Sequence, residues 1–279
     1  MAKGLALTIG LNAVDPKHYE GWSGELNACE ADAEDMTNVG RSRKFRVQNL
    51  MTKRATRAAV LGALAKAAKS LKAGDIFLLT YSGHGGQVPD RNDEEPDHQD
   101  ETWCLYDGEL IDDELYTALG KFARGVRVFV LSDSCHSGTV TKMAYYAARA
   151  AAARGADANG GAPVRYRAMP AEVALRTYRA HRAMYDRLQR AVKANAEDTV
   201  RATTILISGC QDNQLSQDGT FNGLFTANLL RVWNEGRFSG DYRGFHRNIR
   251  KFMPPDQTPN FFMTGAPNRI FEKQVPFTV

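Results

Sequence analysis

Short apolar runs alternate with amphipathic stretches along most of the chain. Asp75–Tyr81 and Val126–Leu131 are rich in β-branched and aromatic residues, which is typical of strands buried on both faces of a parallel sheet. Before the first of them, Thr56–Leu71 places Val60 and Leu64 on one stripe, as an amphipathic helix does. Strands that alternate with helices favour right-handed βαβ units, so we predict an α/β fold with a mostly parallel sheet.

The same pattern extends to the rest of the chain. It predicts further strands over 5–10, 45–50, 101–106, 203–208 and 260–263, and further helices over 26–39, 112–122, 223–233 and 242–252. The region 140–200 has a different character, being rich in Ala and Arg, with a helical piece at 143–153, a break at 155–163 and a long helix near 171–194. We therefore predict one domain made of a large part (1–140), a helical Arg-rich insertion (141–200) and a small C-terminal part (201–279).

Composition and charge narrow the class of protein. No apolar run in the 279 residues approaches the length of roughly 20 residues that a membrane-spanning helix needs. Residues 1–10 fit a first strand better than a leader, so we expect a cytoplasmic protein. Four scattered cysteines without a CxxC pair argue against zinc and disulfides. The net charge is +4, with acidic residues gathered at 90–114 and arginines at 142–193. The arginines are typical of solvated helix faces, and we expect neither nucleic acid nor membrane as a partner.

Two strands run directly into residues that can carry chemistry. The strand at 75–81 leads into Ser82-Gly83-His84-Gly85-Gly86, and the strand at 126–131 leads into Ser132-Asp133-Ser134-Cys135-His136. Taken singly, Cys135 could be a packed small hydrophobe and His84 a surface residue. Neighbouring parallel strands, however, deliver both to the same edge of the sheet, where α/β proteins build active sites. This predicts a Cys135 nucleophile with His84 as base, and backbone N–H groups of Gly85 and Cys135 as oxyanion donors.

These two segments resemble the signature segments of metacaspases and their bacterial relatives, the orthocaspases (peptidase family C14, in the caspase-like clan). The His-to-Cys separation agrees with the roughly 50 residues known for caspases. The resemblance covers residues 5 to about 140, resumes at Ile205-Leu206-Ile207-Ser208-Gly209-Cys210-Gln211-Asp212-Asn213-Gln214, and includes Asp256-Gln257-Thr258-Pro259. It implies a caspase/hemoglobinase fold, a mostly parallel sheet flanked by helices, and a cysteine endopeptidase that needs no cofactor for its chemistry. It also implies a monomer.

The resemblance further implies cleavage of proteins and peptides after Arg or Lys. By residue match, Asp32 and Asp133 would bind the cation of the P1 residue, the one whose carbonyl is attacked, and Ser82 and Cys29 would line that S1 pocket. Two carboxylates hold a planar cation strongly and directionally. The alternatives are a helix-surface carboxylate at Asp32 and a turn residue at Asp133.

Many metacaspases require calcium, and this chain matches part of their ligand set. Asp100, Asp112 and Asp113 occupy three of the family's calcium positions, whereas the fourth position holds Lys142, a cation that would repel the metal. A calcium site and a plain acidic loop with helix N-terminal charges both remain open.

The insertion has two interpretations. In the first, the chain cuts itself in the insertion, where four arginines match the expected P1 preference: Arg149, Arg154, Arg165 and Arg167. The resemblance links such an enzyme to regulated proteolysis and programmed cell death. In the second, the insertion is a lid or docking arm that is never cut. For the whole chain, the alternative to an enzyme is a catalytically idle caspase-like scaffold that binds partners through the basic insertion. The presence of both His84 and Cys135 favours the enzyme.

Overall fold

A mixed six-stranded sheet forms the centre of the computed structural model, which describes residues 2–90, 98–134, 165–194, 200–210, 216–219 and 221–279. Its strand order is β11-β9-β7-β3-β1-β2, and all neighbours are parallel except β11 and β9. The strands are β1 (Gly4–Gly10), β2 (Arg46–Met51), β3 (Ile76–Ser82), β7 (Arg127–Asp133), β9 (Thr203–Ser208) and β11 (Asn260–Thr264). The predicted mostly parallel α/β sheet is confirmed.

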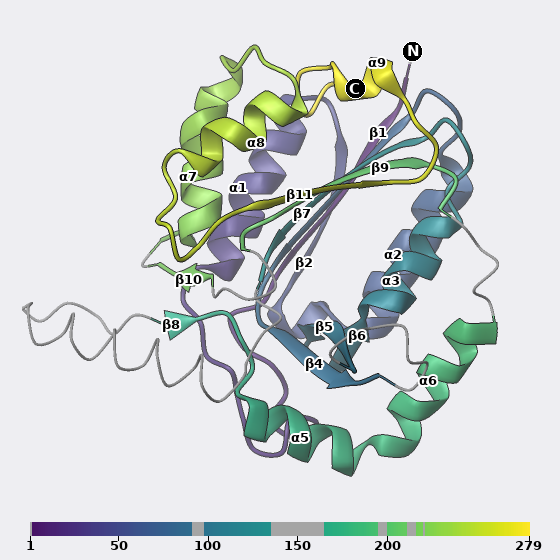
Figure 1. Cartoon of the computed structure of the whole chain (residues 1–279), viewed down its shortest axis with the longest axis vertical. Coiled ribbons are helices and arrows are strands. Elements are labelled where there is room, and N and C mark those ends of the chain that lie inside the picture. The colour runs from purple at the N-terminus through teal and green to yellow at the C-terminus, as the bar shows by residue number, and fades with distance from the viewer. Residues whose placement is uncertain (1, 91–97, 135–164, 195–199, 211–215, 220) are drawn as a thin grey trace, which may run out of the picture.

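Helices cover both faces of this sheet (Figure 1). On one face lie α1 (Cys29–Ser42), α7 (Leu224–Trp233) and α8 (Tyr242–Arg250), and on the other lie α2 (Arg57–Ser70) and α3 (Asp112–Gly120). Strand β3 shows how the sequence feeds both layers, because Phe77 and Leu79 join the core under α2 whereas Ile76 and Leu78 join the core under α7 and α8. Alternating side chains that are all apolar therefore produce the unbroken run seen in the sequence. Short elements η1 (Thr52–Arg54), η2 (Asn234–Gly236) and α9 (Arg269–Glu272) complete this part.

Two small sheets stand at the carboxyl ends of the central strands. Antiparallel β4 (Gly85–Pro89), β5 (Gln99–Leu105) and β6 (Gly108–Ile111) form one, and β8 (Arg165–Tyr166) pairs with β10 (Gln217–Asp218) in the other. Of these, only β5 was predicted. The Gly-Gly start of β4 carries no alternating pattern, and two-residue strands are too short to show one.

The predicted long helix near 171–194 is wrong in one respect: it is two helices. α5 (Ala171–Ala180) ends and α6 (Arg182–Ala194) begins around His181, whose Nε2 lies 3.0 Å from the carbonyl oxygen of His18 and whose ring stacks on the His18 ring at 4.0 Å. Together the two helices form an arm that packs Tyr178 and Tyr185 against Val88 and Ile111 of the small sheet. The expected helix at 143–153 and break at 155–163 lie outside the described residues. No helix in the described ranges is long and apolar enough to cross a membrane.

Candidate active site

The register of the sheet brings the two candidate catalytic segments to one edge. Ser82 at the end of β3 is the direct partner of Asp133 at the end of β7. His84 and Cys135 each follow two residues later along the chain. Cys135 itself, the proposed nucleophile and second oxyanion donor, lies outside the described residues.

His84 is held by the loop that follows β1. Its Nε2 lies 3.0 Å from the carbonyl oxygen of Gly24, and the Trp22 ring packs on the imidazole at 4.7 Å between centroids. Gly24 adopts a positive φ of 55°, and a Cβ there would come within 3.1 Å of the His84 ring, so only glycine fits without strain. The other ring nitrogen, Nδ1, is buried and makes no hydrogen bond of normal geometry with any described residue.

The environment of His84 favours its neutral form. Burial lowers the pKa of His84 to about 4, against smaller opposing contributions from the backbones of Gly24 and Ala168. A neutral imidazole is the form that can accept a proton at neutral pH. Sequence reasoning missed Trp22 and Gly24. The available signal was their place in a polar, Gly-containing loop after β1, at the same edge of the sheet.

Three carboxylates converge on one buried guanidinium beside His84. Asp32 of α1, Asp133 of β7 and Asp218 of β10 lie 2.7, 2.9 and 3.0 Å from the terminal nitrogens of Arg167. The Arg167 side chain is fully buried, and Asp32 and Asp133 are nearly so. Burial alone would disfavour the guanidinium charge, but Asp133, Asp32 and Asp218 raise the pKa of Arg167 well above its ordinary range. The structure therefore brings the two predicted pocket acids together and adds a third.

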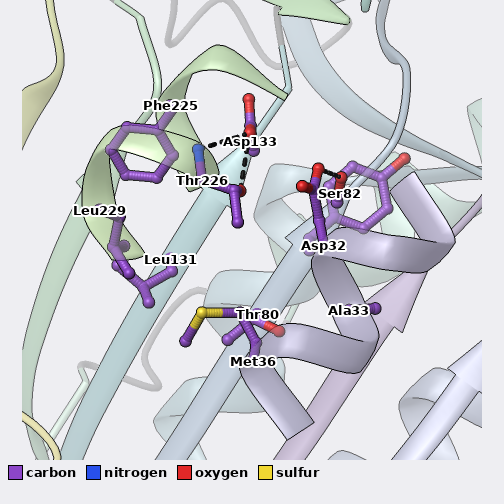
Figure 2. Close-up of a pocket in the computed structure, with 11 residues that line it drawn as sticks. Asp32, Ala33, Met36, Thr80, Ser82, Leu131, Asp133, Phe225, Thr226 and Leu229 are labelled. Atoms are coloured by element: carbon purple, nitrogen blue, oxygen red, sulfur yellow. Dashed lines mark hydrogen bonds between the residues drawn. The ribbon is translucent and has the colours of Figure 1, made fainter. Parts of the chain in front are cut away.

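Each pocket carboxylate is fixed by donors other than Arg167. Asp133 accepts hydrogen bonds from Thr226 N and Oγ1 (Figure 2) and from Ser216 Oγ at 2.6 Å. Asp32 accepts from Ser82 Oγ at 2.7 Å and from the backbone N–H of Gly223 at 3.0 Å. Burial, followed by the nearby Asp133, raises the pKa of Asp32, and Arg167 pulls it back down. Without a cation, simultaneous ionisation of these buried carboxyl groups would be strongly unfavourable, because their negative charges repel one another.

The remaining predicted pocket residues lie around the same guanidinium. Ser82 Oγ accepts a hydrogen bond from Arg167 Nη1 at 2.8 Å while it donates to Asp32. Cys29 is fully buried, and burial raises its thiol pKa, so this cysteine stays a neutral lining group. Behind the acids, a small cavity is lined by Met36, Thr80, Leu131, Phe225 and Leu229 (Figure 2). Asp218 was missed because β10 has no sequence pattern, although it follows the carboxyl end of β9.

The backbone around Arg167 is bound as an added strand. Arg167 N–H donates to the Ser216 carbonyl at 3.0 Å, extending the antiparallel pairing of β8 with β10. On its other side, the Gly85 N–H donates to the Arg167 carbonyl oxygen at 3.0 Å, and Met169 N–H donates to the Gly85 carbonyl at 2.8 Å. The predicted oxyanion donor Gly85 thus contacts the carbonyl of the residue in the acidic pocket.

The other arginines named for self-cleavage do not share this setting. Arg165 lies opposite Asp218 in the pairing of β8 with β10, but its Nη1 donates to the carbonyl oxygen of Glu25 at 2.9 Å and it forms no ion pair with the three carboxylates. Arg149 and Arg154 lie outside the described residues, as does Lys142.

The candidate calcium residues are neighbours, but the described part of the chain contains no group of three or more His, Cys, Asp or Glu side chains arranged to hold a metal ion. Burial and then the nearby Glu101, Asp113 and Asp100 raise the pKa of Asp112 well above its ordinary range. Mutual repulsion of this kind is what a divalent cation relieves. Calcium binding by Asp100, Asp112 and Asp113 stays a prediction.

Comparison with known proteins agrees with this architecture. The family model of the caspase domain (peptidase C14) matches residues 3–277. Metacaspase-1 of Emericella nidulans is 35% identical over 156 residues, 50% of this chain and 37% of that protein. Metacaspase-1 of Eremothecium gossypii is 29% identical over 251 residues, 79% of this chain and 54% of that protein. The chain thus spans about a third to a half of these curated relatives.

A solved structure is similar over the whole length. The crystal structure of protein GSU0716 from Geobacter sulfurreducens is 63% identical, covers 99% of both chains and has a TM-score of 0.88. Two observations define the class of protein. The parallel strands of the sheet end at a Gly-framed histidine and an acidic pocket, and the family model matches nearly the full chain. The chain belongs to the caspase-domain family, peptidase family C14, and its curated relatives are metacaspases.

Proposed function

We propose that this protein is a cysteine endopeptidase that cleaves peptide bonds after Arg or Lys. The observation that carries the proposal is the seating of Arg167, whose side chain fills the acidic pocket while its carbonyl oxygen accepts from Gly85 N–H at 3.0 Å. This is the arrangement a P1 residue needs, with the side chain recognised and the scissile carbonyl held by an oxyanion donor. Segment 165–169 supports this reading as an internal substrate.

The chemistry follows from groups at this edge of the sheet. His84, neutral above pH 4, takes the proton of the Cys135 thiol, and the thiolate attacks the P1 carbonyl carbon. The carbonyl π electrons move to the oxygen, where Gly85 N–H stabilises the charge. The tetrahedral intermediate then expels the P1′ amine, which takes the proton from His84, and leaves a thioester on Cys135. Water activated by His84 hydrolyses that thioester to the carboxylic acid.

The proposed preference for a basic P1 residue rests on charge. A guanidinium in the pocket meets Asp32, Asp133 and Asp218, whereas an Asp side chain would add a fourth buried carboxylate without a cation. Lysine reaches the same oxygens as a point charge with fewer fixed hydrogen bonds, so we expect Arg to be the better P1 residue.

The same contacts make Arg167–Ala168 the preferred self-cleavage bond. Until it is cut or displaced, Arg167 occupies the pocket that an external substrate needs. We therefore propose that the chain holds its own site closed and that processing in the arm precedes full activity. Arg165 is a poorer candidate because its side chain lies outside the pocket.

Turnover of short reporter peptides tests the proposal. Full-length protein, incubated until its mass stops changing, should cleave reporters ending in Arg and Lys and leave an Asp reporter intact, each with and without millimolar calcium. A difference between the calcium arms would show whether Asp100, Asp112 and Asp113 serve a metal. Cys135→Ala is the matched control and should be inactive. No turnover of Arg or Lys reporters in either arm, or turnover by Cys135→Ala, would overturn the proposed function.

A further inference from the structure

An apolar cluster lies beyond the candidate scissile bond. If Arg167 is P1, then Ala168 is P1′ and Met169 is P2′, the second residue of the leaving half of the substrate. Met169 is 1% exposed and packs with Val14, Tyr19 and Cys104, with Trp22 at the margin of the cluster. These partners come from the loop after β1 and from β5, and Val173 and Ala174 of α5 in the arm complete the cluster.

The backbone in this region is bound in register with the small sheet. Ala168 forms a parallel bridge with Gly85, the first residue of β4, and Met169 N–H donates to the Gly85 carbonyl at 2.8 Å. Gly85 therefore holds the chain on both sides of Ala168. This fixes where the side chain of the following residue must go.

The cluster offers no cation to an acidic side chain. The Tyr19 hydroxyl already donates to the Leu105 carbonyl at 2.7 Å, so Tyr19 presents its ring. Cys104 is fully buried, and burial raises its thiol pKa well above the ordinary value, which keeps it uncharged. A Cβ on Gly86 would lie 2.6 Å from the Met169 Cε, 2.8 Å from Glu109 Oε2 and 2.9 Å from Thr102 Oγ1, so this wall requires glycine. The buried Glu109 carboxyl at this wall would repel an acidic P2′ side chain. An ionised acidic P2′ side chain would be desolvated here without a cation.

We propose that Val14, Tyr19, Trp22 and Cys104 form an S2′ subsite that selects substrates with an unbranched or γ-branched apolar residue at P2′. The proposal rests on the proposed function, since it takes Arg167–Ala168 as the scissile bond. Trp22 also packs on His84, so one ring borders both the base and this subsite. The substrate class is then a basic residue at P1 and a Met- or Leu-like residue two positions further on.

The test uses two kinds of substrate. One is a quenched peptide series Arg-Tyr-Arg-Ala-X-Pro, with X being Met, Leu, Ala, Asp or Lys; the other is an Arg reporter that has no primed residues. With fully processed protein, the Met and Leu peptides should exceed the Asp peptide by about tenfold or more in kcat/KM, the scale set by a buried apolar contact.

A pocket variant sharpens the result. Val14→Ala should lower the Met-to-Ala ratio at P2′ by several-fold, because it removes apolar wall from the subsite. Val60→Ala, a buried valine of α2 in a different core cluster, is the matched control for loss of core volume and should leave the ratio unchanged. Thermal unfolding of both variants establishes that they are folded.

The outcomes separate the two proposals. Turnover of the Arg reporter with equal kcat/KM for all five peptides overturns the S2′ subsite and leaves the peptidase proposal standing. Preference for Asp or Lys at X likewise overturns the subsite. Failure to cleave the Arg reporter overturns the proposed function instead.

Discussion

Arg165, at the start of β8, and Arg167, directly after β8, are two residues apart, yet they occupy opposite environments. Arg167 is fully buried with three carboxylates and the Ser82 hydroxyl around its guanidinium. Arg165 is partly exposed and reaches one backbone carbonyl. In a strand, residues i and i+2 face the same side, so alternation does not separate them. The difference comes from what each meets there, a desolvated acidic pocket for one and the rim of the loop after β1 for the other.

The largest expected effect is on cleavage itself. Cys135→Ala should reduce the rate of cutting at Arg167–Ala168 by at least about 10³-fold, the scale on which loss of a nucleophile acts. Intact-mass analysis of wild type beside the variant over time measures this. If wild type were cut at Arg165–Tyr166 and not after Arg167, the assignment of Arg167 as the preferred self-cleavage site would be contradicted.

Stability should separate the same two positions. In the Cys135→Ala background, Arg167→Met leaves three buried carboxylates without a cation and should cost about 3–5 kcal/mol in the free energy of unfolding. Arg165→Met should stay within about 0.5 kcal/mol, as a surface change. Urea unfolding followed by fluorescence compares them, and equal midpoints for the two variants would contradict the role of the pocket.

Acid should act on His84, which lies next to the docked segment. Its pKa is lowered from 6.5 to about 4 by burial, so between these values the unfolded chain binds a proton that the folded chain does not. Stability is therefore complete above pH 6.5 and falls as the pH drops toward 4, by about 3 kcal/mol from this group. Burial and the neighbouring His181 lower the pKa of His18 to about 4 as well, which adds to the loss.

The measurement is urea unfolding of the Cys135→Ala protein from about pH 7.5 to about pH 4.5, a range that covers most of this window. His84→Gln should lose less stability across that range than the protein that keeps His84. An equal loss in both would mean that His84 is not held neutral in the folded state.

The smallest effect in this set is expected from neutralising one pocket acid. Asp32→Asn or Asp133→Asn should lower kcat/KM on an Arg reporter, because each removes a charged hydrogen-bond partner of the P1 side chain. The expected loss of transition-state stabilisation is about 1–3 kcal/mol. Glu34→Gln, on the same helix α1 but exposed and paired with Arg41, serves as the control and should have little effect. Unchanged kinetics in both pocket variants would refute their assignment.

The sequence by itself determined the frame of this protein. Buried runs such as 75–81 and 126–131 required strands covered on both faces, and the helices between them required parallel neighbours, so His84 and the segment leading to Cys135 had to reach one edge. The signature segments then indicated the family. These features are local or follow from alternation, and local patterns survive in a linear sequence.

Tertiary structure alone decided which residues meet at that edge. Arg167 was one of several arginines in an insertion without a recognisable pattern, and Asp218 lay on a two-residue strand. Gly24 and Trp22 reach His84 from a loop 60 residues away in the chain. Residues so far apart in the sequence are brought together by packing and by the free-energy cost of burying a charge without a partner. Both depend on the folded structure, so a local sequence pattern cannot show them.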